Sequence, residues 1–389
     1  MKNNLIPLFK VFMSPNASKE VSKVLDSGFI GEGEKVKQFE KQLKNFVNTS
    51  HLITTNSATS ALHLALHLLK NNTYGKKTYN WPLIQEGDEV LTTPLTCTAT
   101  NWPILANRLD IKWVDIDTKS CNMCLDDLKH KLSEKTKIIM LVHWGGNVID
   151  LDRLREIQNY CENKYGFKPV IIEDAAHALG SEYKEKKLGN TGHQNFVIHS
   201  FQAIKHLTTI DGGCLILPDS KLTKRARLLR WYGIDREDNR KDFRCENNIK
   251  EWGYKFHMND ICATVGLENI KHVKELLKIN KDNSKYYDKH LKNHPQVELL
   301  KIKSNVESAN WLYTIKVQSQ DKFMKKMKKC GIMVSRVHER NDTHSCVDKF
   351  STHLPNLNKL TQQMICIPNG WWVSPEEIKK IVSCIKDGW

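Results

Sequence analysis

The sequence predicts an α/β protein with a large, mostly parallel sheet between layers of helices, followed by a smaller α+β domain. Two observations carry this prediction. Strand-like and helix-like segments alternate through roughly the first 220 residues, and several strand-like segments are continuous apolar runs, as in strands buried on both faces. After residue 250 the segments become longer, helical and lysine-rich. A chain of 389 residues is long enough for both units.

The elements follow the order expected for parallel strands joined by crossover helices. In the first unit the predicted strands are 51–55, 88–92, 112–115, 137–142, 169–173, 195–200 and 214–217. The predicted helices there are 57–70, 98–107, 151–165 and 221–232. The second unit has predicted helices 260–283, 322–330 and 374–386 and a strand at 311–317. Residues 1–250 and 251–389 are therefore expected to form a large and a small domain that pack closely.

The composition is typical of a soluble protein. Hydrophobic residues make up 40% of the chain and charged residues 26%, as in globular and not in disordered proteins. The sequence has no apolar run of about 18 residues, and its N-terminus lacks the features of a secretory signal. We therefore expect a cytoplasmic protein without a membrane partner.

The cysteines are not expected to form a disulfide framework. There are 11 of them, an odd number without regular spacing, and most are expected to be reduced and buried. Cys121 and Cys124 have the CxxC spacing, but no second CxxC or histidine pair lies at zinc-finger distance. We expect no bound metal.

The net charge of +15 does not identify a partner. Basic proteins often bind nucleic acid, but here the lysines are spread over the predicted surface helices without a stripe of interleaved aromatic residues. We therefore expect no nucleic-acid partner. The charge is compatible with an anionic cofactor and an anionic substrate, and equally with a solvated surface.

Residues 171–216 carry the clearest chemical signal. Asp174 stands at the end of one predicted buried strand, and Lys205 follows another. Ligands bind at the carboxyl ends of strands in parallel sheets, so both side chains could face one crevice. Chemistry with pyridoxal phosphate (PLP) needs this pair: a lysine amine forms a Schiff base with the aldehyde, and a carboxylate keeps the pyridine nitrogen protonated. Taken separately, Asp174 would be a helix cap or turn residue and Lys205 a surface lysine.

Residues 54–69 are suited to binding a phosphate. A predicted strand ends there, and small hydroxyl-bearing residues open an amphipathic helix whose first N–H groups and positive dipole end attract anions. Ala58 and Thr59 are the expected donors. The structural alternative is ordinary capping of this helix by Ser57 or Thr59.

Together these segments resemble the DegT/DnrJ/EryC1/StrS family of PLP-dependent sugar aminotransferases. The resemblance covers nearly the whole chain, and its segments occur in the family's order: SGFIGEGEKVKQFEKQL, NSATSALHLAL, GDEVLTTPLTCTATNWPI, VHWGG, EDAAHALGS, HSFQAIKHLTTIDGG and GYKFHMNDICATVGL. It implies an aspartate-aminotransferase-like fold of type I, with a large α/β/α cofactor domain, a small C-terminal α+β domain, and pyridoxal 5'-phosphate as cofactor.

The resemblance also implies roles for the central residues. Lys205 would be the Schiff-base lysine and would carry the proton that is moved during amino transfer. Asp174 would pair with the pyridine nitrogen. His177 stands where many members carry a glutamine that bonds the ring hydroxyl, and an imidazole nitrogen can make the same contact.

Two further cofactor contacts follow from the same resemblance. Ser200 would bind the cofactor phosphate together with Ala58 and Thr59. Cys97 occupies the position at which many members stack an aromatic residue on the pyridine ring. A thiol has a smaller contact area with the pyridine ring than an aromatic side chain has. The neighbouring Trp102 could compensate for this loss of contact.

Substrate contacts are expected from two places. One is His143 in the VHWGG segment. The other is the segment SRVHERNDTHS (residues 335–345), which lies where relatives have a histidine-containing substrate loop and offers His338, Arg340 and His344. For these three, exposed structural residues are the alternative.

Two other segments depart from the family pattern. Residues 253–259 resemble the part that reaches across a dimer interface toward the neighbouring active site, so a homodimer is implied, but Lys255 and His257 stand where relatives often carry asparagine and arginine. Trp371 and Trp372 are inserted near the C-terminal helix, and both packing and substrate stacking are open for them.

The function that the resemblance implies is transfer of an amino group, with L-glutamate as the usual donor, to the keto sugar of a nucleoside-diphosphate sugar. The alternatives are a PLP-dependent sugar dehydratase, an aminotransferase for a small keto phosphate, and a non-catalytic sensor with the same fold. Dehydratases of this fold often carry histidine at the lysine position, and a sensor would be expected to lack the lysine or the acid. Lys205 and Asp174 therefore favour the aminotransferase.

Overall fold

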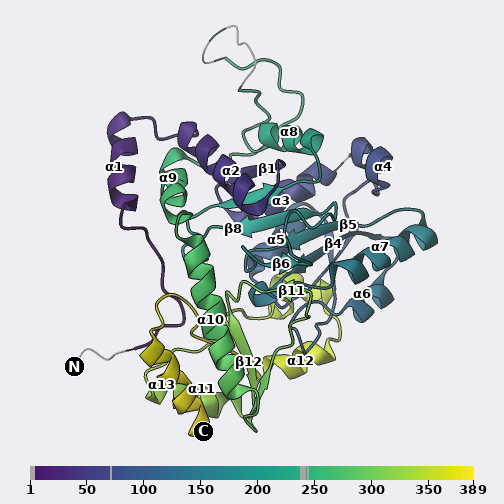
Figure 1. Ribbon diagram of the computed structural model, residues 1–389. Helices are drawn as coiled ribbons and strands as arrows, with labels where there is room; N and C mark the ends of the chain where they lie inside the picture. Colours follow the sequence, from purple (N-terminus) through teal and green to yellow (C-terminus); the bar gives the residue numbers. More distant parts are fainter. Residues whose placement is uncertain (1–4, 71, 237–241, 243–244) are drawn as a thin grey trace.

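A seven-stranded sheet forms the centre of the large domain (Figure 1). The computed structural model describes residues 5–70, 72–236, 242 and 245–389. In sheet order the strands are β1 (Leu52–Thr55), β9 (Gly213–Ile216), β8 (Phe196–Ser200), β5 (Val170–Asp174), β4 (Thr136–Val142), β2 (Glu89–Thr92) and β3 (Asp110–Trp113). Neighbouring strands are parallel except at β9, which is antiparallel to both β1 and β8. All the strands predicted for this domain are present, and the mostly parallel sheet is confirmed.

Helices cover both faces of this sheet. The helices of the large domain are α1 (Ala17–Ser27), which packs on α9 outside these layers, α2 (Glu34–Val47), α3 (Ala58–Leu69), α4 (Thr73–Tyr79), α5 (Thr98–Ala106), α6 (Leu125–Lys131), α7 (Leu151–Tyr165), α8 (Ser220–Leu229) and α9 (Asp260–Asn269). Along β4, Ile138 and Met140 pack with α3, α5 and α8, whereas Ile139 and Leu141 pack with α2, α7 and α9. This double burial is the reason why the strand sequences are continuous apolar runs.

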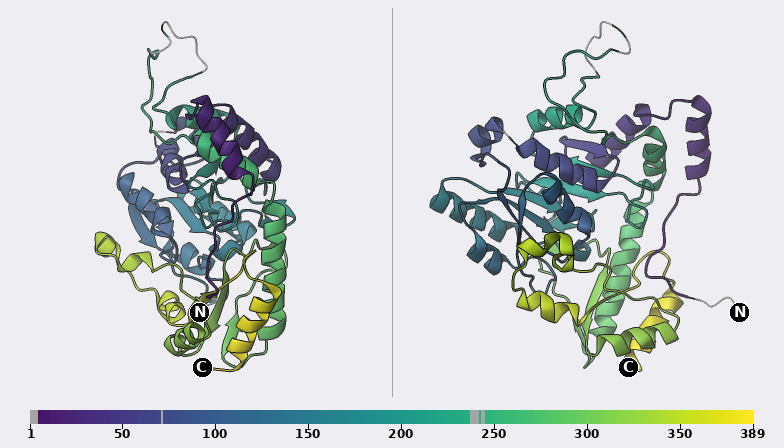
Figure 2. Two further views of the ribbon diagram at one scale, coloured as in Figure 1. Left: turned by 90° about the vertical axis from the view of Figure 1, so that its left-hand side faces the viewer. Right: turned by 180° about the vertical axis from the view of Figure 1, so that it is seen from behind.

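The small domain is built on an antiparallel sheet with a core of its own. Its strands are β10 (Val297–Leu299), β12 (Tyr313–Val317) and β13 (Met364–Ile367), and its helices are α10 (Val273–Leu291), α11 (Gln320–Lys329) and α13 (Pro375–Lys386). Helix α10 runs from the large domain down into the small one (Figure 2). The remaining elements are α12 (Pro355–Thr361), the small sheet of β11 (Val306–Glu307), β6 (Glu182–Tyr183) and β7 (Lys186–Lys187), and the 3-10 helices η1 (Trp144–Gly146), η2 (Asn341–Thr343) and η3 (Ser345–Phe350).

The predicted boundary at residue 250 does not separate the domains cleanly. Some segments after it pack in the large domain, and the N-terminal segment packs in the small domain. Helix α9 packs in the core of the large domain, and so does α12, where the Asp115 carboxylate accepts the backbone N–H of Leu357 at 2.9 Å. At the other end of the chain, Ile6 pairs with Ile332 and lies in the core of the small domain. A division at one position in the sequence is therefore only approximate.

The single helix predicted over residues 260–283 is wrong. The structure has α9 and α10 there, with a turn at residues 270–272 between them. The reason is Asn269, whose buried side chain accepts the N–H of Ser14 at 2.8 Å and donates to the carbonyl of Thr208 at 2.9 Å. These bonds fix the end of α9 to the large domain, while α10 leaves in another direction.

The cysteines agree with the sequence prediction only in part. Nine are free, and Cys330 and Cys384 form a disulfide that links the end of α11 to α13. The expectation that most cysteines are buried is wrong. Those with partial or full exposure are Cys97, Cys124, Cys245, Cys262, Cys330 and Cys346.

Two absences concern the described residues only. None of their helices is both long and apolar enough to cross a bilayer. Their His, Cys, Asp and Glu side chains form no group of three or more that could hold a metal ion.

A buried ion pair connects α2, β1 and the end of α8. The Arg230 guanidinium donates to the Glu40 carboxylate at 2.6 Å and to the carbonyl of Thr54 at 2.8 Å. The same carboxylate accepts the Thr54 N–H at 2.9 Å. Both charged side chains are almost completely buried, so each depends on the other.

We expect Arg230→Met to lower the free energy of unfolding by about 3 kcal/mol, because it leaves the Glu40 carboxylate buried without its main partner. The matched control is Arg227→Met, which removes a more exposed guanidinium 3.2 Å from the same carboxylate and should cost under about 1 kcal/mol. Urea unfolding of the cofactor-free protein measures both. Equal losses for the two variants would contradict the importance of the buried pair.

Candidate active site

The structure brings Asp174 and Lys205 to the same edge of the sheet. Asp174 is the last residue of β5 and pairs with Ile198 of β8. Lys205 lies in the loop between β8 and β9, which closes on itself through a bond from the Phe201 N–H to the carbonyl of Gly212 at 2.8 Å. Within the loop, the Lys205 N–H donates to the carbonyl of Gln202 at 2.9 Å. The loop thus holds the lysine just beyond the carboxyl end of the strand.

Burial moves both groups toward their neutral forms. It lowers the pKa of Lys205 to about 7, although the electrostatic interactions with Asp174 and Cys97 act to raise it. Burial likewise raises the pKa of Asp174, against hydrogen bonds from the Thr100 hydroxyl at 2.7 Å and the Ala176 N–H at 3.0 Å. The lysine is therefore a nucleophilic amine near neutral pH.

The residues expected to bind phosphate meet across three neighbouring strand ends. Gly213 of β9 pairs with Ser200 of β8 on one side and with Thr55 of β1 on the other. A Cβ at Gly213 would lie 2.5 Å from the backbone nitrogen of Ala58, so only glycine allows α3 to begin this close to β9. Ser200 and the first turn of α3 are neighbours for this reason.

Capping and phosphate binding do not exclude each other at α3. The Ser57 side chain caps the helix by accepting the Ser60 N–H at 3.1 Å, as the structural alternative expected. Among the described residues, no acceptor bonds the N–H groups of Ala58 and Thr59. Two half-buried donors at the positive end of a helix thus remain open to an anion.

The imidazole ring of His177 lies near Lys205 and is neutral. Its ring stacks on Trp311 at 4.2 Å between centroids, and its Nδ1 accepts the Gly145 N–H at 3.4 Å. Burial, assisted by the positive charge of Lys205, holds the pKa of His177 well below its usual value. The remaining nitrogen, Nε2, can donate a hydrogen bond and lies 3.5 Å from Nε2 of His338.

Cys97, just before α5, and Trp102, within it, face different neighbours. Cys97 precedes the first turn of the helix and is close enough to Lys205 to affect its charge. Trp102, expected as a replacement for the missing aromatic ring, contacts His344 at 5.7 Å and packs on the core of the large domain.

The structure gives His143 a supporting position instead of the expected substrate contact. Its side chain is fully buried at the end of β4, where Nδ1 accepts the Ile149 N–H at 3.3 Å and Nε2 donates to the Glu173 carboxylate at 2.8 Å. Neither ring nitrogen is left for a substrate. Its backbone N–H donates to the carbonyl of Asp174 at 3.2 Å, so the residue steadies the strand end beside the acid.

Only one of the three candidates in residues 335–345 reaches the lysine. His338 stacks parallel to His177, with 3.5 Å between their Nε2 atoms, and burial lowers the pKa of His338 to about 4. Arg340 is held away by a bidentate pair with Asp342, at 2.7 and 2.5 Å. His344 is partly exposed.

Trp371 and Trp372 hold the N-terminal segment. The Trp372 indole N–H donates to the carbonyl of Pro7 at 2.9 Å, and Phe12 meets the Trp371 ring edge-on at 5.5 Å. Lys10 lies over the same ring at 5.1 Å. Packing therefore accounts for both tryptophans, and through them residues 7–12 lie close to the active-site loop.

Two residues at the site carried no signal that sequence reasoning used. Thr100 binds the Asp174 carboxylate, and Trp311 contacts both His177 and Lys205. Trp311 is distant in the sequence from every recognised segment, so only the packing of the small domain on the large one reveals it.

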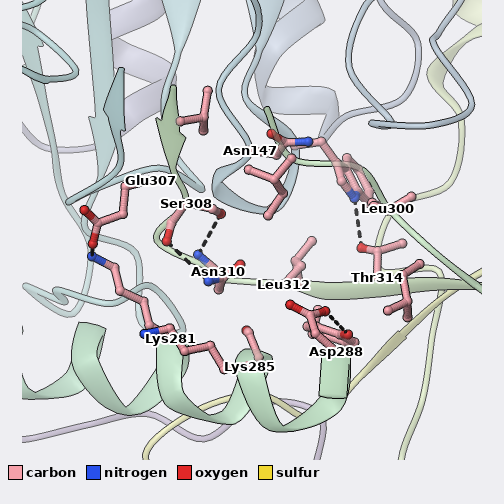
Figure 3. Close-up of a pocket in the computed structure, with 17 residues that line it drawn as sticks. Asn147, Lys281, Lys285, Asp288, Leu300, Glu307, Ser308, Asn310, Leu312 and Thr314 are labelled. Atoms are coloured by element: carbon pink, nitrogen blue, oxygen red, sulfur yellow. Dashed lines mark hydrogen bonds and ion pairs between the residues drawn. The ribbon is translucent and has the colours of Figure 1, made fainter. Parts of the chain in front are cut away.

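Two cavities adjoin this cluster. One of about 20 Å³ is lined by Lys205, His206, Trp311 and Trp371, among others. A larger one of about 490 Å³ lies between α10 and β12 (Figure 3). There Lys281, Lys285 and Asp288 project from α10 opposite Asn147, Leu312 and Thr314. Trp144 separates it from the histidines of the active site, since its ring contacts His177 and its indole N–H donates to Thr314 at 3.0 Å.

Comparison with known proteins identifies the family. A sequence model of the DegT/DnrJ/EryC1/StrS aminotransferase family matches residues 13–386. The chain belongs to this family. Its structure is similar to AtS13 from Actinomadura melliaura (42% identity, TM-score 0.93, 100% of both chains). It is also similar to the sugar aminotransferase CalS13 from Micromonospora echinospora (40% identity, TM-score 0.92, 99% of this chain and 100% of that one).

A curated relative extends the comparison. The chain is 28% identical to the UDP-4-amino-4-deoxy-L-arabinose–oxoglutarate aminotransferase of Shewanella sediminis, over 100% of this chain and 99% of that protein. Family membership makes the protein a PLP-dependent aminotransferase of fold type I. The residues fit this cofactor: two open N–H donors and Ser200 suit its phosphate, a buried acid suits its pyridine nitrogen, and a lysine with a low pKa suits its aldehyde.

The low pKa of Lys205 predicts how the cofactor-free protein captures PLP. The rate should rise about tenfold per pH unit below pH 7, where the amine is mostly protonated, and level off above about pH 7. Stopped-flow absorbance of the cofactor measures it. In the Lys205→Ala variant, surface lysines should react slowly and their rate should keep rising toward pH 10. If the rate in the wild type also rose up to pH 10, the pKa of the Lys205 amine would not be lowered.

Proposed function

We propose that the protein transfers an amino group from L-glutamate to the keto sugar of a nucleoside-diphosphate sugar, with PLP held through a Schiff base at Lys205. The single observation that carries the proposal is the grouping of Lys205, Asp174 and the open first turn of α3 at one edge of the sheet. These three features match the aldehyde, the pyridine nitrogen and the phosphate of one cofactor.

The relatives support the substrate class. CalS13 is a sugar aminotransferase, and the name of the Shewanella sediminis enzyme joins a UDP-linked amino sugar to oxoglutarate. Oxoglutarate is the keto acid that glutamate becomes when it gives up its amino group, which supports glutamate as the donor.

Each residue has a role in this proposal. Bound PLP supplies an electron sink for the carbanion that forms when the substrate loses a proton. Asp174 keeps the pyridine nitrogen protonated, and the His177 Nε2–H donates to the ring hydroxyl. Ser200, with the N–H groups of Ala58 and Thr59, binds the phosphate.

Lys205 moves the proton, and its environment suits proton transfer. A catalytic acid or base works best when its pKa is close to the working pH, and the pKa of Lys205 is lowered to about 7. His338 stands next to His177 with a neutral ring and contributes a hydrogen bond to the substrate. The proposal gives Arg340 no such role, since its guanidinium is paired with Asp342.

A visible absorption spectrum tests the proposal. Wild-type protein with PLP should show a lysine-dependent band that L-glutamate bleaches, whereas Lys205→Ala should show neither the band nor the bleaching. Lys278→Ala removes a lysine that is 76% exposed on α10 and should behave as wild type. A band that persists in Lys205→Ala would refute the role of this lysine.

The acceptor requires a second assay. Protein whose absorbance band has been bleached by L-glutamate should regain the band when nucleotide-linked keto sugars are added. Small keto phosphates should not restore it. The reverse preference would contradict the proposed acceptor while leaving the half-reaction with glutamate intact.

We also propose a homodimer. Residues 253–259 pass beside the N-terminus of α3, since the Asn56 N–H donates to the carbonyl of Phe256 at 2.8 Å. Large apolar side chains are exposed near both ends of this region, with Phe29 at 84% and Trp252 at 66% exposure. A second copy of the chain would cover them beside the cofactor phosphate.

The double variant Phe29→Glu/Trp252→Glu should convert the dimer to monomer, because it places charge in an apolar contact. Size-exclusion chromatography with light scattering measures the mass. As a control, Met324→Glu on α11 changes a side chain that is 37% exposed at the far end of the molecule and should leave the dimer intact (Figure 1). A wild-type mass of one chain would rule the proposal out.

A further inference from the structure

The indole ring of Trp311 is in direct contact with the side-chain amine of Lys205. The lysine Nζ lies 3.4 Å from the centroid of the indole ring, well inside the range of about 6 Å over which a ring attracts a cation. The ring is almost completely buried, so little water competes for the amine.

A second contact ties the ring to the backbone that carries the lysine. The Trp311 indole N–H donates to the carbonyl of Ile204 at 3.0 Å, and Ile204 immediately precedes Lys205. This hydrogen bond keeps the ring beside the backbone of the loop that carries the lysine.

Trp311 is itself fixed from several sides. The preceding residue, Asn310, offers its carbonyl to the side-chain amides of Asn280 at 3.1 Å and Asn369 at 2.7 Å. Phe9 stacks on the indole ring at 5.3 Å, and His177 stacks on it at 4.2 Å. A ring held in this way can determine where the amine goes.

We propose that Trp311 is a positioning residue that holds the side-chain amine of Lys205 within reach of the cofactor aldehyde. This inference rests on the proposed function, because it takes Lys205 as the covalent partner of PLP. An aromatic face is suited to this role because it attracts the ammonium, yet it carries no full negative charge that would lock the lysine in its protonated form.

A double-mutant cycle on PLP affinity tests the proposal without any assay of turnover. The four proteins are wild type, Trp311→Leu, Lys205→Ala and the double variant. Leucine keeps an apolar side chain but removes the ring. Trp311→Leu should weaken PLP binding about tenfold when Lys205 is present, because the amine is then no longer held within reach of the aldehyde. It should also reduce the lysine-dependent absorbance band. In the Lys205→Ala background it should change the affinity by less than about twofold.

Two matched variants separate positioning from packing. Trp311→Phe keeps a ring but loses the bond to Ile204 and should weaken binding by about threefold, with the band retained. Trp389→Leu makes the same change at an indole ring of the small domain that contacts His294 and Phe323, and it should leave PLP affinity within about twofold. If Trp311→Leu does not fold, as thermal unfolding would show, the cycle with Trp311→Phe decides in its place.

The outcomes distinguish this inference from the proposed function. Equal losses with and without Lys205 would overturn the positioning role and reduce Trp311 to packing, as would unchanged binding in Trp311→Leu. If Lys205→Ala alone binds PLP as tightly as wild type and keeps the band, then the assignment of Lys205 fails first.

Discussion

Helices bury both faces of the seven-stranded sheet, and this burial decides where polar chemistry can occur. Inside the sheet a charged group has no water and needs a buried partner, as Glu173 has in His143, so most strand residues are apolar. Asp174 and Ser200 are the last residues of their strands, and the loop with Lys205 begins directly after one of them. The active-site groups are therefore gathered at one edge by the same force that builds the core.

The same burial sets the electrostatics of the site. Lys205 and Asp174 are both driven toward neutrality, and each limits the effect on the other through its opposite charge. The balance leaves an amine that can attack at neutral pH and a carboxyl group whose pKa is raised by burial. A protonated pyridine nitrogen beside this carboxyl group would favour its ionised form. Cofactor binding would therefore relieve an electrostatic cost that folding imposes.

The contact between the domains completes the site. The segment just before β12 supplies Trp311, the N-terminal segment supplies Phe9, and the large domain supplies His177, and these three rings stack in sequence. Trp371 and Trp372 keep the N-terminal segment in place. Parts of the chain more than 100 residues apart thus depend on one another around a single lysine.

The sequence alone determined the sheet and the central pair. Apolar runs place the strands because they reflect local burial, and the family segments around Asp174 and Lys205 identify the chemistry. The break between α9 and α10, the supporting role of His143 and the pairing of Arg340 with Asp342 were decided by tertiary structure. In each case the polar side chain found a partner through folding, and which partner it would find is not written in the spacing of residues along the chain. Trp311 belongs to the same group, because its contact with Lys205 exists only once the two domains have packed.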